Sequence, residues 1–460
     1  MEIEGKDTHH IDQDSLETKI NGVASDELTQ VDPLESKDVL ETKARGYKLL
    51  CYGNAECDQF YVNEEESESK RPVEVDLSNI PIQFKIIKIA CGIQHTVILT
   101  DSGKVFSFGN DDDFCLGRVS VGVSTTPGLV ELEEPVDMIS AGEGHSCAAN
   151  SISGKVYLWG AIKSSLHGKL LLFEKPNLIS NFNMRRKGIK DLKSGSNHVL
   201  VLCGNNCYSM GDNDTGCLGI VSKSERHKKV TTEFNAVNLT KVIRIFTTSY
   251  NSFFECSKGR IYACGLNNYE QLGFKTEPDE SLQVVSQYTI TEPLLLDYLD
   301  GLEIKDIVGG EQHVLILMRN GDIYGAGRND DGELGLLSDS HILGGYKKLS
   351  HVSRCSEIQS YNHYNYALGS SELQYYAWGA GFSYVLANGK EDSLEEARPI
   401  NNEKFFKENM PRVLRIGFGF VCYLSGEMGK QEDLNEAVLS VKKRRNIKVK
   451  PQLIENKRLS

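Results

Sequence analysis

The sequence predicts an all-β protein, a seven-bladed β-propeller closed by joining N- and C-terminal strands, with disordered tails. Three observations lead to this fold: a phrase that recurs seven times, a hairpin frame inside each copy, and two incomplete copies at the ends. The phrase is an aromatic or small residue followed by glycine, with successive glycines 51 to 62 residues apart. The copies are Tyr52-Gly53, Phe108-Gly109, Trp159-Gly160, Met210-Gly211, Cys264-Gly265, Ala326-Gly327 and Trp378-Gly379. A unit of this size cannot bury its apolar face alone, so the copies must stack.

Each copy contains a predicted β-hairpin, and the clearest one is Ile89–Gly117, IACGIQHTVILTDSGKVFSFGNDDDFCLG. Alternating apolar residues predict a strand over 91–100, a turn at 101–103 and a returning strand over 105–108. The same frame fits Ser140–Gly160, Ser194–Gly219, Thr248–Gly273, Val308–Gly335 and, more loosely, Gln359–Gly379. The chain is therefore a series of stacked hairpins at a regular interval.

The first and last copies are incomplete in a complementary way. Lys48–Gly53 supplies a closing strand with no partner before it, and Val413–Gly426 supplies an opening strand with nothing after it. Joining the two makes one complete unit from both ends of the chain. Such closure removes the exposed sheet edges and yields seven blades, for which four short strands each would suit the repeat length.

The predicted organisation is an acidic disordered tail over 1–45, the propeller over 46–426, and a basic tail over 427–460. The first segment holds twelve acidic and five basic side chains, and it lacks the apolar surface that would offset the entropy of ordering. In Val438–Ser460 there are eight Lys or Arg and one Glu. Its cluster of Lys442, Lys443, Arg444 and Arg445 is typical of a nuclear-import signal, of a nucleic-acid patch or of a solvated charged tail.

Composition indicates a soluble intracellular protein without a membrane span. No apolar run is long enough to cross a bilayer, and the first residues, MEIEGKDTHH, lack the basic and apolar regions of a secretory signal. The twelve cysteines are scattered through predicted strands and show no paired zinc spacing. We therefore expect them to be reduced and buried, and we expect no metal site.

No catalytic motif is present in the sequence. The chain contains no phosphate-binding GxxxxGK[ST], no HExxH and no GxSxG. His95, His145, His198 and His313 recur once per blade at the same strand position, which favours a hydrogen-bonding role between blades over catalysis. We expect no covalent chemistry and no cofactor. A closed ring with protected edges also favours a monomer.

The repeat resembles the regulator of chromosome condensation family over about residues 46–426. The resemblance is carried by a GxxH phrase followed by a strand, as in Gly92-Ile93-Gln94-His95, and by a W/F-G-x-N-x-x-G-x-L-G phrase, as in the stretch from Gly327 to Gly335. Its best-known members are guanine-nucleotide exchange factors for the small GTPase Ran. They use one propeller face and a β-wedge from the third blade to release nucleotide without covalent chemistry. The resemblance thus implies a regulatory exchange factor in the nucleus.

The family's β-wedge has a counterpart in this chain. After Trp159-Gly160, the third blade lacks the usual N-x-x-G-x-L-G phrase. The alternative is an ordinary blade connection whose leucines pack inward. By position and character the wedge corresponds to Ser165, Leu166, His167, Gly168, Lys169 and Leu170.

The resemblance also assigns GTPase-binding positions on the rim, and several of them depart from the family pattern. The positions are Glu56, Glu143, Asn197, Asn268 and Gln312. Glu56 and Glu143 replace aspartates, Asn197 replaces an aspartate by an amide, and Gln312 replaces a histidine, while Asn268 matches. Phe420 also stands where the family has histidine. Loss of one charge-assisted hydrogen bond costs about 1 to 3 kcal/mol, so exchange could be weakened, retuned to a diverged GTPase or lost. Because the ring closure, the wedge and the basic tail are retained together, we expect retuning.

Chromatin docking is a further implication of the family. After the fourth blade, the basic stretch Ser222–Val230 (SKSERHKKV) would present Lys223, Arg226, Lys228 and Lys229 to DNA phosphates or an acidic histone surface. The family's basic N-terminal tail is acidic here, and the basic C-terminal segment is a possible substitute. The expected partners are a Ran-type GTPase, nucleosomes or DNA, and an import receptor.

Two alternatives to exchange activity remain open at this stage. One is a propeller scaffold or adaptor that binds a non-GTPase partner on the same face. The other is a chromatin-binding protein without exchange activity, in which the basic stretches dominate.

Overall fold

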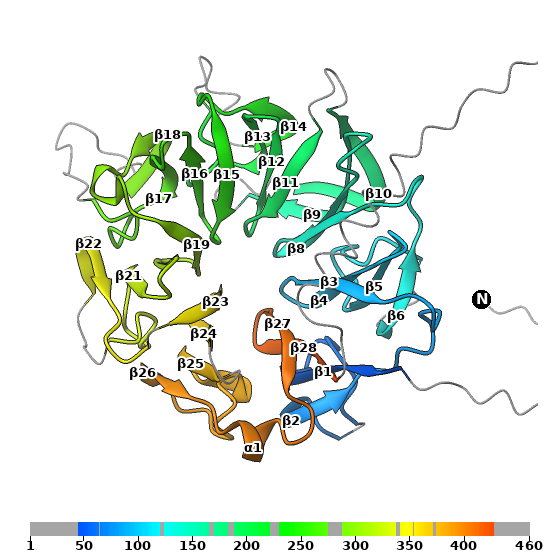
Figure 1. The fold of residues 1–460 in the computed structure, drawn as a ribbon. Helices are drawn as coiled ribbons and strands as arrows, with labels where there is room; N and C mark the ends of the chain where they lie inside the picture. Colours follow the sequence, from blue (N-terminus) through cyan, green and yellow to red (C-terminus); the bar gives the residue numbers. More distant parts are fainter. Residues whose placement is uncertain are drawn as a thin grey trace, which may run out of the picture. The chain divides into compact units, whose positions relative to one another are not determined.

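Seven four-stranded antiparallel sheets form a ring around a central axis (Figure 1). The computed structural model describes residues 45–63, 65–119, 124–164, 170–182, 188–220, 230–274, 288–336, 341–352, 354–370 and 374–426. The predicted seven-bladed β-propeller is therefore confirmed. No helix in these ranges is long and apolar enough to cross a membrane.

Blades are numbered along the chain, and each runs from its innermost to its outermost strand. Blade 1 consists of β27 (Pro411–Ile416), β28 (Phe420–Gly426), β1 (Tyr47–Asn54) and β2 (Glu68–Glu74). Blade 2 consists of β3 (Ile86–Cys91), β4 (His95–Thr100), β5 (Val105–Gly109) and β6 (Ser124–Val130). Blade 3 consists of β7 (Met138–Ala141), β8 (Gly144–Ala149), β9 (Lys155–Lys163) and β10 (Leu170–Asn181). Blade 4 consists of β11 (Ile189–Ser194), β12 (His198–Cys203), β13 (Asn206–Asp212) and β14 (Val230–Ala236).

The remaining three blades have the same strand order. Blade 5 consists of β15 (Val242–Thr247), β16 (Asn251–Cys256), β17 (Ile261–Leu266) and β18 (Thr289–Leu295). Blade 6 consists of β19 (Ile304–Gly309), β20 (His313–Met318), β21 (Ile323–Gly327) and β22 (Ile342–Lys348). Blade 7 consists of β23 (Cys355–Tyr361), β24 (Tyr364–Gly369), β25 (Tyr375–Gly379) and β26 (Leu394–Pro399). A short helix, α1 (Asn402–Phe405), and two 3-10 turns, η3 (Asp297–Leu299) and η4 (Phe382–Tyr384), lie in connections.

Ring closure takes place in blade 1, where β1 lies between β2 and β28. The register of β1 against β28 is unbroken from Tyr47 opposite Gly426 to Gly53 opposite Phe420. The predicted joining of the two chain ends is confirmed. One detail of the prediction is wrong, because 91–100 is not a single strand: the chain reverses between Cys91 and His95, so each opening half contains two strands.

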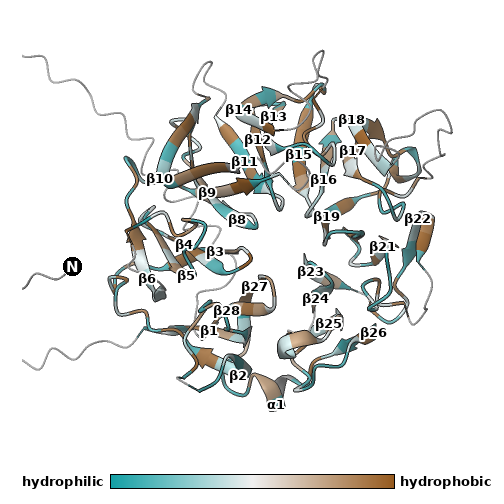
Figure 2. Cartoon of the chain, turned by 180° about the vertical axis from the view of Figure 1, so that it is seen from behind, coloured by the Kyte–Doolittle hydropathy of each residue, from teal (hydrophilic) through white to brown (hydrophobic). Residues whose placement is uncertain are grey.

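The core is divided among the interfaces between blades. In the described part of the chain, seven larger apolar clusters each join two neighbouring blades. In blade 3 the largely apolar strand β9 (Figure 2) buries Val156, Leu158 and Ile162 against blade 4. Because each blade buries its faces only against its neighbours, removing one blade would expose two interfaces.

The GxxH loops form a chain of backbone hydrogen bonds around the inner edge of the ring. The amide of Ile93 donates to the carbonyl of Glu143 (3.0 Å), and the amide of Glu143 donates to Ser196 in the next blade (2.9 Å). The series continues from Ser196 to Ser249 at 3.0 Å. Gly92 is required here because a Cβ at this position would lie 2.5 Å from the carbonyl oxygen of Gly142.

The predicted role of the repeated histidines is confirmed for three of the four. In each of the three, the ring Nε2 forms a hydrogen bond of 2.8 to 3.0 Å with a side-chain oxygen of the following blade. The pairs are His95 with Ser146, His198 with Ser252 and His313 with Asn365. The hydroxyl protons of both serines are already donated to carbonyl oxygens in loops of the histidine's own blade, so the histidines must donate from Nε2.

His145 is the exception among the four histidines. Both of its ring nitrogens are buried without a hydrogen-bond partner in the described structure. The residue that follows the equivalent phrase in blade 4 is Val199, which has no hydroxyl. An imidazole buried in this way loses its hydration without compensation.

His145→Phe is expected to leave the stability of the protein unchanged or to raise it. Phe420 already occupies this position in blade 1, where its ring meets Gly417 as the ring of His145 meets Gly142. His198→Phe, the matched control, loses the bond to Ser252 and should lower the free energy of unfolding by about 1 kcal/mol. Urea unfolding measures the free energy of unfolding of both variants. An equal decrease in the two would contradict the prediction that only His198 forms a stabilising hydrogen bond.

Acidification below pH 6.5 is expected to destabilise the propeller. Burial lowers the pKa of His95, His198 and His313 to about 4 and that of His145 to about 3. The unfolded chain therefore binds more protons between pH 6.5 and 4, so stability is complete above 6.5 and is lost as pH falls. At pH 5.5 each of these histidines should lower the free energy of unfolding by about 1 kcal/mol. Thermal unfolding from pH 7.5 to 5 measures this, and a flat profile would exclude it.

Candidate functional site

All five predicted rim residues lie in loops at the same end of the strands. We call this end the rim face; it bears the loops between first and second strands and between third and fourth strands of each blade. Antiparallel order places both kinds of loop on one side of the ring. The five are Glu56 and Asn268 in the outer loops, and Glu143, Asn197 and Gln312 in the inner loops. Among them, the described structure brings only Glu143 and Asn197 into contact.

Asn197 connects Glu143 to the end of β9. Its Nδ2 donates to Glu143 Oε2 (2.9 Å), and its Oδ1 accepts from the backbone amide of Lys163 (2.9 Å). Burial raises the pKa of Glu143, and the hydrogen bond from Asn197 opposes this shift. The amide supplies both a donor for the carboxylate and an acceptor for the backbone amide, whereas an ionised carboxylate at this position could only accept.

The hairpin of β9 and β10 extends beyond the blade. β9 continues three residues past Gly160, whereas β5, β21 and β25 end at the corresponding glycine. The extension is paired from Phe173 opposite Gly160 to Leu170 opposite Lys163. The predicted wedge residues Ser165, Leu166, His167, Gly168 and Lys169 lie outside the described residues, and Leu170 begins β10. The wedge thus stays a prediction, carried on a paired extension of the third blade.

Both neighbouring blades hold the base of this hairpin. Lys163 Nζ forms an ion pair with Asp113 Oδ2 in blade 2 (2.7 Å), and Ser164 Oγ donates to Asp214 Oδ2 in blade 4 (2.6 Å). Gly144 leaves room for the ion pair, because a Cβ there would lie 2.6 Å from Asp113 Oδ2. The sequence analysis missed Asp113, Lys163 and Asp214; the break in the third-blade phrase was the only signal near them.

The other predicted rim residues are positioned without contact to this network. Glu56 is exposed, and its amide donates to Asn54 Oδ1 (2.8 Å). Asn268 Oδ1 accepts from Gln271 Nε2 (3.3 Å). Gln312 is half-buried, and its backbone carbonyl accepts a hydrogen bond from the backbone amide of Arg328 (2.9 Å). Their assignment as GTPase-binding positions stays a prediction.

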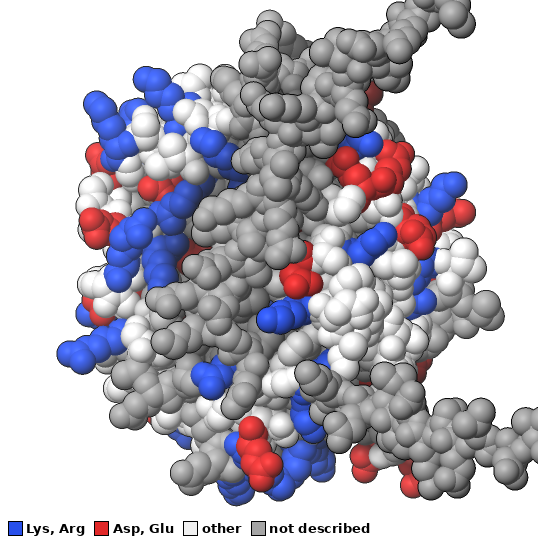
Figure 3. Space-filling model, turned by 45° about the vertical axis from the view of Figure 1, so that its right-hand side comes forward, with Lys and Arg blue, Asp and Glu red and all other residues white. Residues whose placement is uncertain are grey.

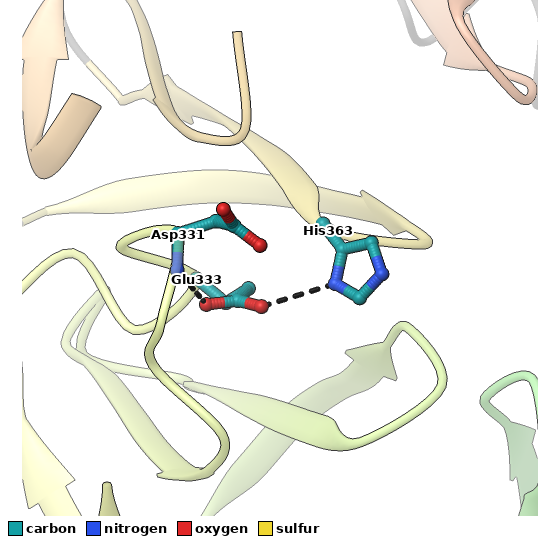
Figure 4. Close-up of side chains that lie close together, drawn as sticks. All are labelled: Asp331, Glu333 and His363. Atoms are coloured by element: carbon teal, nitrogen blue, oxygen red, sulfur yellow. Dashed lines mark hydrogen bonds and ion pairs between the residues drawn. The ribbon is translucent and has the colours of Figure 1, made fainter. Parts of the chain in front are cut away.

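Asp331, Glu333 and His363 form a cluster with metal-ligand chemistry on the rim face (Figure 4). Arg328 already supplies a cation there: its guanidinium lies 2.6 Å from Glu333 Oε1, 3.1 Å from Asp331 Oδ2 and 2.7 Å from His363 Nδ1. Burial opposes ionisation of Glu333, but the contact with His363 Nδ1 and hydrogen bonds from the backbone hold its pKa at about 2. The arrangement is an ion pair within blade 6, with His363 of blade 7 in hydrogen-bond contact beside it.

The side of the molecule seen in Figure 3 does not carry charge of one sign. Figure 3 shows Lys and Arg side chains interspersed with Asp and Glu over the side of the ring that faces the viewer. The basic residues predicted to address chromatin or an import receptor lie outside the described residues: Lys223, Arg226, Lys228, Lys229, Lys442, Lys443, Arg444 and Arg445.

Residues 48–424 match the family model described as the RCC1-like domain. The chain belongs to this family. The regulator of chromosome condensation of Homo sapiens is 27% identical over 363 residues, which cover 75% of this chain and 82% of the human protein. The guanine nucleotide exchange factor SRM1 of Saccharomyces cerevisiae is 25% identical over 396 residues, which cover 75% of this chain and 79% of that protein.

A solved structure supports the fold of this RCC1-like chain. The crystal structure of Prp20p from Saccharomyces cerevisiae, described with its binding properties to Gsp1p and histones, has a TM-score of 0.72 and 23% identity. The alignment covers 86% of this chain and 95% of Prp20p. At this identity the likeness establishes the shared propeller.

Asn197→Asp is expected to destabilise the base of the hairpin. It places a second carboxylate beside Glu143 and removes the donor that Glu143 now accepts from, at a cost of about 1 to 3 kcal/mol. In the double variant Glu143→Gln, Asn197→Asp, the new glutamine amide donates in the opposite direction and should restore most of the loss. Urea unfolding tests the pair. An unaffected single variant, or a double variant no better than the single, would refute the coupling.

Proposed function

We propose that the protein is a guanine-nucleotide exchange factor for a Ran-type small GTPase. Family membership and the name of the yeast relative, a guanine nucleotide exchange factor, support the proposal. The observation that carries it is the third-blade hairpin, which extends past the blade on the rim face and is held at its base by both neighbours. A projecting element needs such support to act against a bound partner.

Exchange of this kind needs no covalent step. A factor that binds the nucleotide-free GTPase more tightly than the loaded one lowers nucleotide affinity by the same ratio. In this proposal the wedge segment 165–169 occupies the centre of the interface and competes with phosphate contacts. The GTPase then rests on the surrounding rim loops.

The rim residues divide into two roles in this proposal. Glu143 and Asn197 are positioning residues, because their side chains bond to each other and Asn197 fixes the amide of Lys163. Glu56, Asn268 and Gln312 contact the GTPase directly. An amide at 197 therefore accommodates the neighbouring Glu143, and its lack of charge is compatible with exchange.

The nuclear part of the proposal rests on the relatives. One solved structure of yeast RCC1 (Prp20) is bound to Kap60, and Prp20p was characterised with histones. For this chain we propose nuclear import through 442–445 and chromatin contact through the basic residues of 223–229, with a monomeric propeller and no membrane partner.

Replacing 165–169 by a glycine-serine linker of equal length is expected to slow nucleotide release. Contacts at the centre of an interface are typically worth about 2 kcal/mol or more, so the rate should fall by at least about tenfold. The measurement is release of a fluorescent guanine nucleotide from the Ran-type GTPase of the same organism, with the propeller at catalytic concentration.

Lys104→Ala, in a turn at the opposite end of the strands, is the matched control and should release nucleotide at the unmodified rate. If the unmodified protein does not accelerate release, exchange activity is excluded. A stable complex that is insensitive to guanine nucleotides would then favour the scaffold function, and strongly salt-dependent nucleosome binding would favour chromatin binding alone.

A further inference from the structure

A cleft of about 950 Å³ opens at the outer surface between blades 7 and 1. Strands β2 and β26, the loop that follows β25 and the region of α1 line it. In Figure 1 these elements meet at the lower edge of the ring. We call it the seam cleft, and the residues that define it here are Lys70, Arg71, Lys390, Arg398, Lys404 and Phe405.

The seam cleft is basic in an acidic protein. Its lining has five basic and two acidic side chains, a net charge of +3, whereas the whole chain has a net charge of −13. Lys390 lies 3.7 Å from Asp392, and both are more than two-thirds exposed. Arg398 pairs with Glu396 at 3.2 Å and is 58% exposed. Such exposed ion pairs contribute little to stability, so Lys390 and Arg398 can leave these carboxylates and pair with the carboxylates of a ligand.

The floor of the seam cleft is apolar. Leu386, Ala387 and Phe405 line it and keep 1%, 5% and 9% of their surface exposed. They belong to the apolar cluster between blades 7 and 1, so the floor is fixed by the core beneath it. A ligand would therefore meet basic walls above a rigid apolar base.

The loop after β25 departs from the repeat at this place. Ala387 stands where blades 2 and 6 have Gly117 and Gly335, and it keeps their left-handed conformation with φ of 55°. Ser383 in the same loop also has a positive φ of 51°, whereas the φ of 60° at Tyr384 is part of the repeat and recurs at Asp58, Phe114 and Glu270. The left-handed backbone conformation costs a non-glycine residue conformational energy, and residues strained in this way are concentrated at ligand-binding loops. Lys70 lies over the ring of Tyr384 at 4.8 Å, which joins this loop to β2.

We propose that the seam cleft binds an acidic, extended segment of a partner protein, with one apolar side chain of that segment on the floor. The basic walls suit carboxylates, and the floor suits a leucine-sized group. Asp392 and Glu395 also line the cleft. Their carboxylates accept hydrogen bonds from the backbone N–H groups of an extended peptide, donors that a sugar-phosphate backbone lacks, which favours a peptide over a nucleic acid.

The test is fluorescence anisotropy of a fluorescein-labelled peptide that alternates glutamate with glycine and carries one central leucine. Saturable binding that weakens with added salt is expected. The double variant Arg398→Glu, Lys404→Glu should bind about tenfold more weakly. A peptide with serine in place of leucine should also bind with about tenfold lower affinity, because no apolar side chain is buried on the floor of the cleft.

Lys104→Glu, Lys175→Glu is the matched control, since both lysines are exposed and lie on blades 2 and 3. Its affinity should equal that of the unmodified protein. Three outcomes would overturn the proposal: no saturable binding, an equal loss in the control, or no loss in the cleft variant. Tighter, Arg398- and Lys404-dependent binding of double-stranded DNA would assign the cleft to nucleic acid instead. Equal thermal unfolding of all variants confirms that they are folded.

Discussion

The pairing of β1 with β28 is the constraint on which the rest of the structure depends. Every blade buries its faces only against its two neighbours, so an open ring would leave blade 1 divided and two apolar interfaces uncovered. The unbroken register from Tyr47 to Gly53 joins the ends of the chain. The loop hydrogen bonds and the histidine contacts between blades then act within a ring whose circumference is already fixed.

Closure also explains how a repeated fold carries a local function. In blade 3 the repeat is broken after Gly160, and the two adjacent blades supply Asp113 and Asp214 to hold the extended hairpin. At the seam of blades 7 and 1 it is broken again, where tyrosines replace the usual histidine and tryptophan: Tyr364 Oη bonds to the carbonyl of Phe420 (3.1 Å), and Tyr52 pairs with Tyr366. Departures from the repeat, more than the repeat itself, mark the surfaces with specific chemistry.

The sequence was sufficient to predict the number of blades and the closure, because glycine spacing and complementary ends are properties of the chain alone. It was not sufficient for the strand limits, since the reversal at Gly92 depends on a close approach to Gly142 in another blade. For the same reason the sequence could not predict the hydrogen bond between Glu143 and Asn197, because these residues are 54 positions apart and meet only when their blades pack. The phrase identified both residues, but their partners were set by tertiary structure.

The position of β1 also constrains the order in which the protein can be made. Among the described strands, β1 is the first to leave the ribosome, and its inner neighbour, β28, is the last. Until β28 has been synthesised, β1 has an unpaired edge and only β2 beside it, a hairpin too small to be stable in water. The nascent chain must therefore keep an aggregation-prone strand apart from other chains until β28 emerges, and a stop codon before Phe420 would leave that edge permanently open.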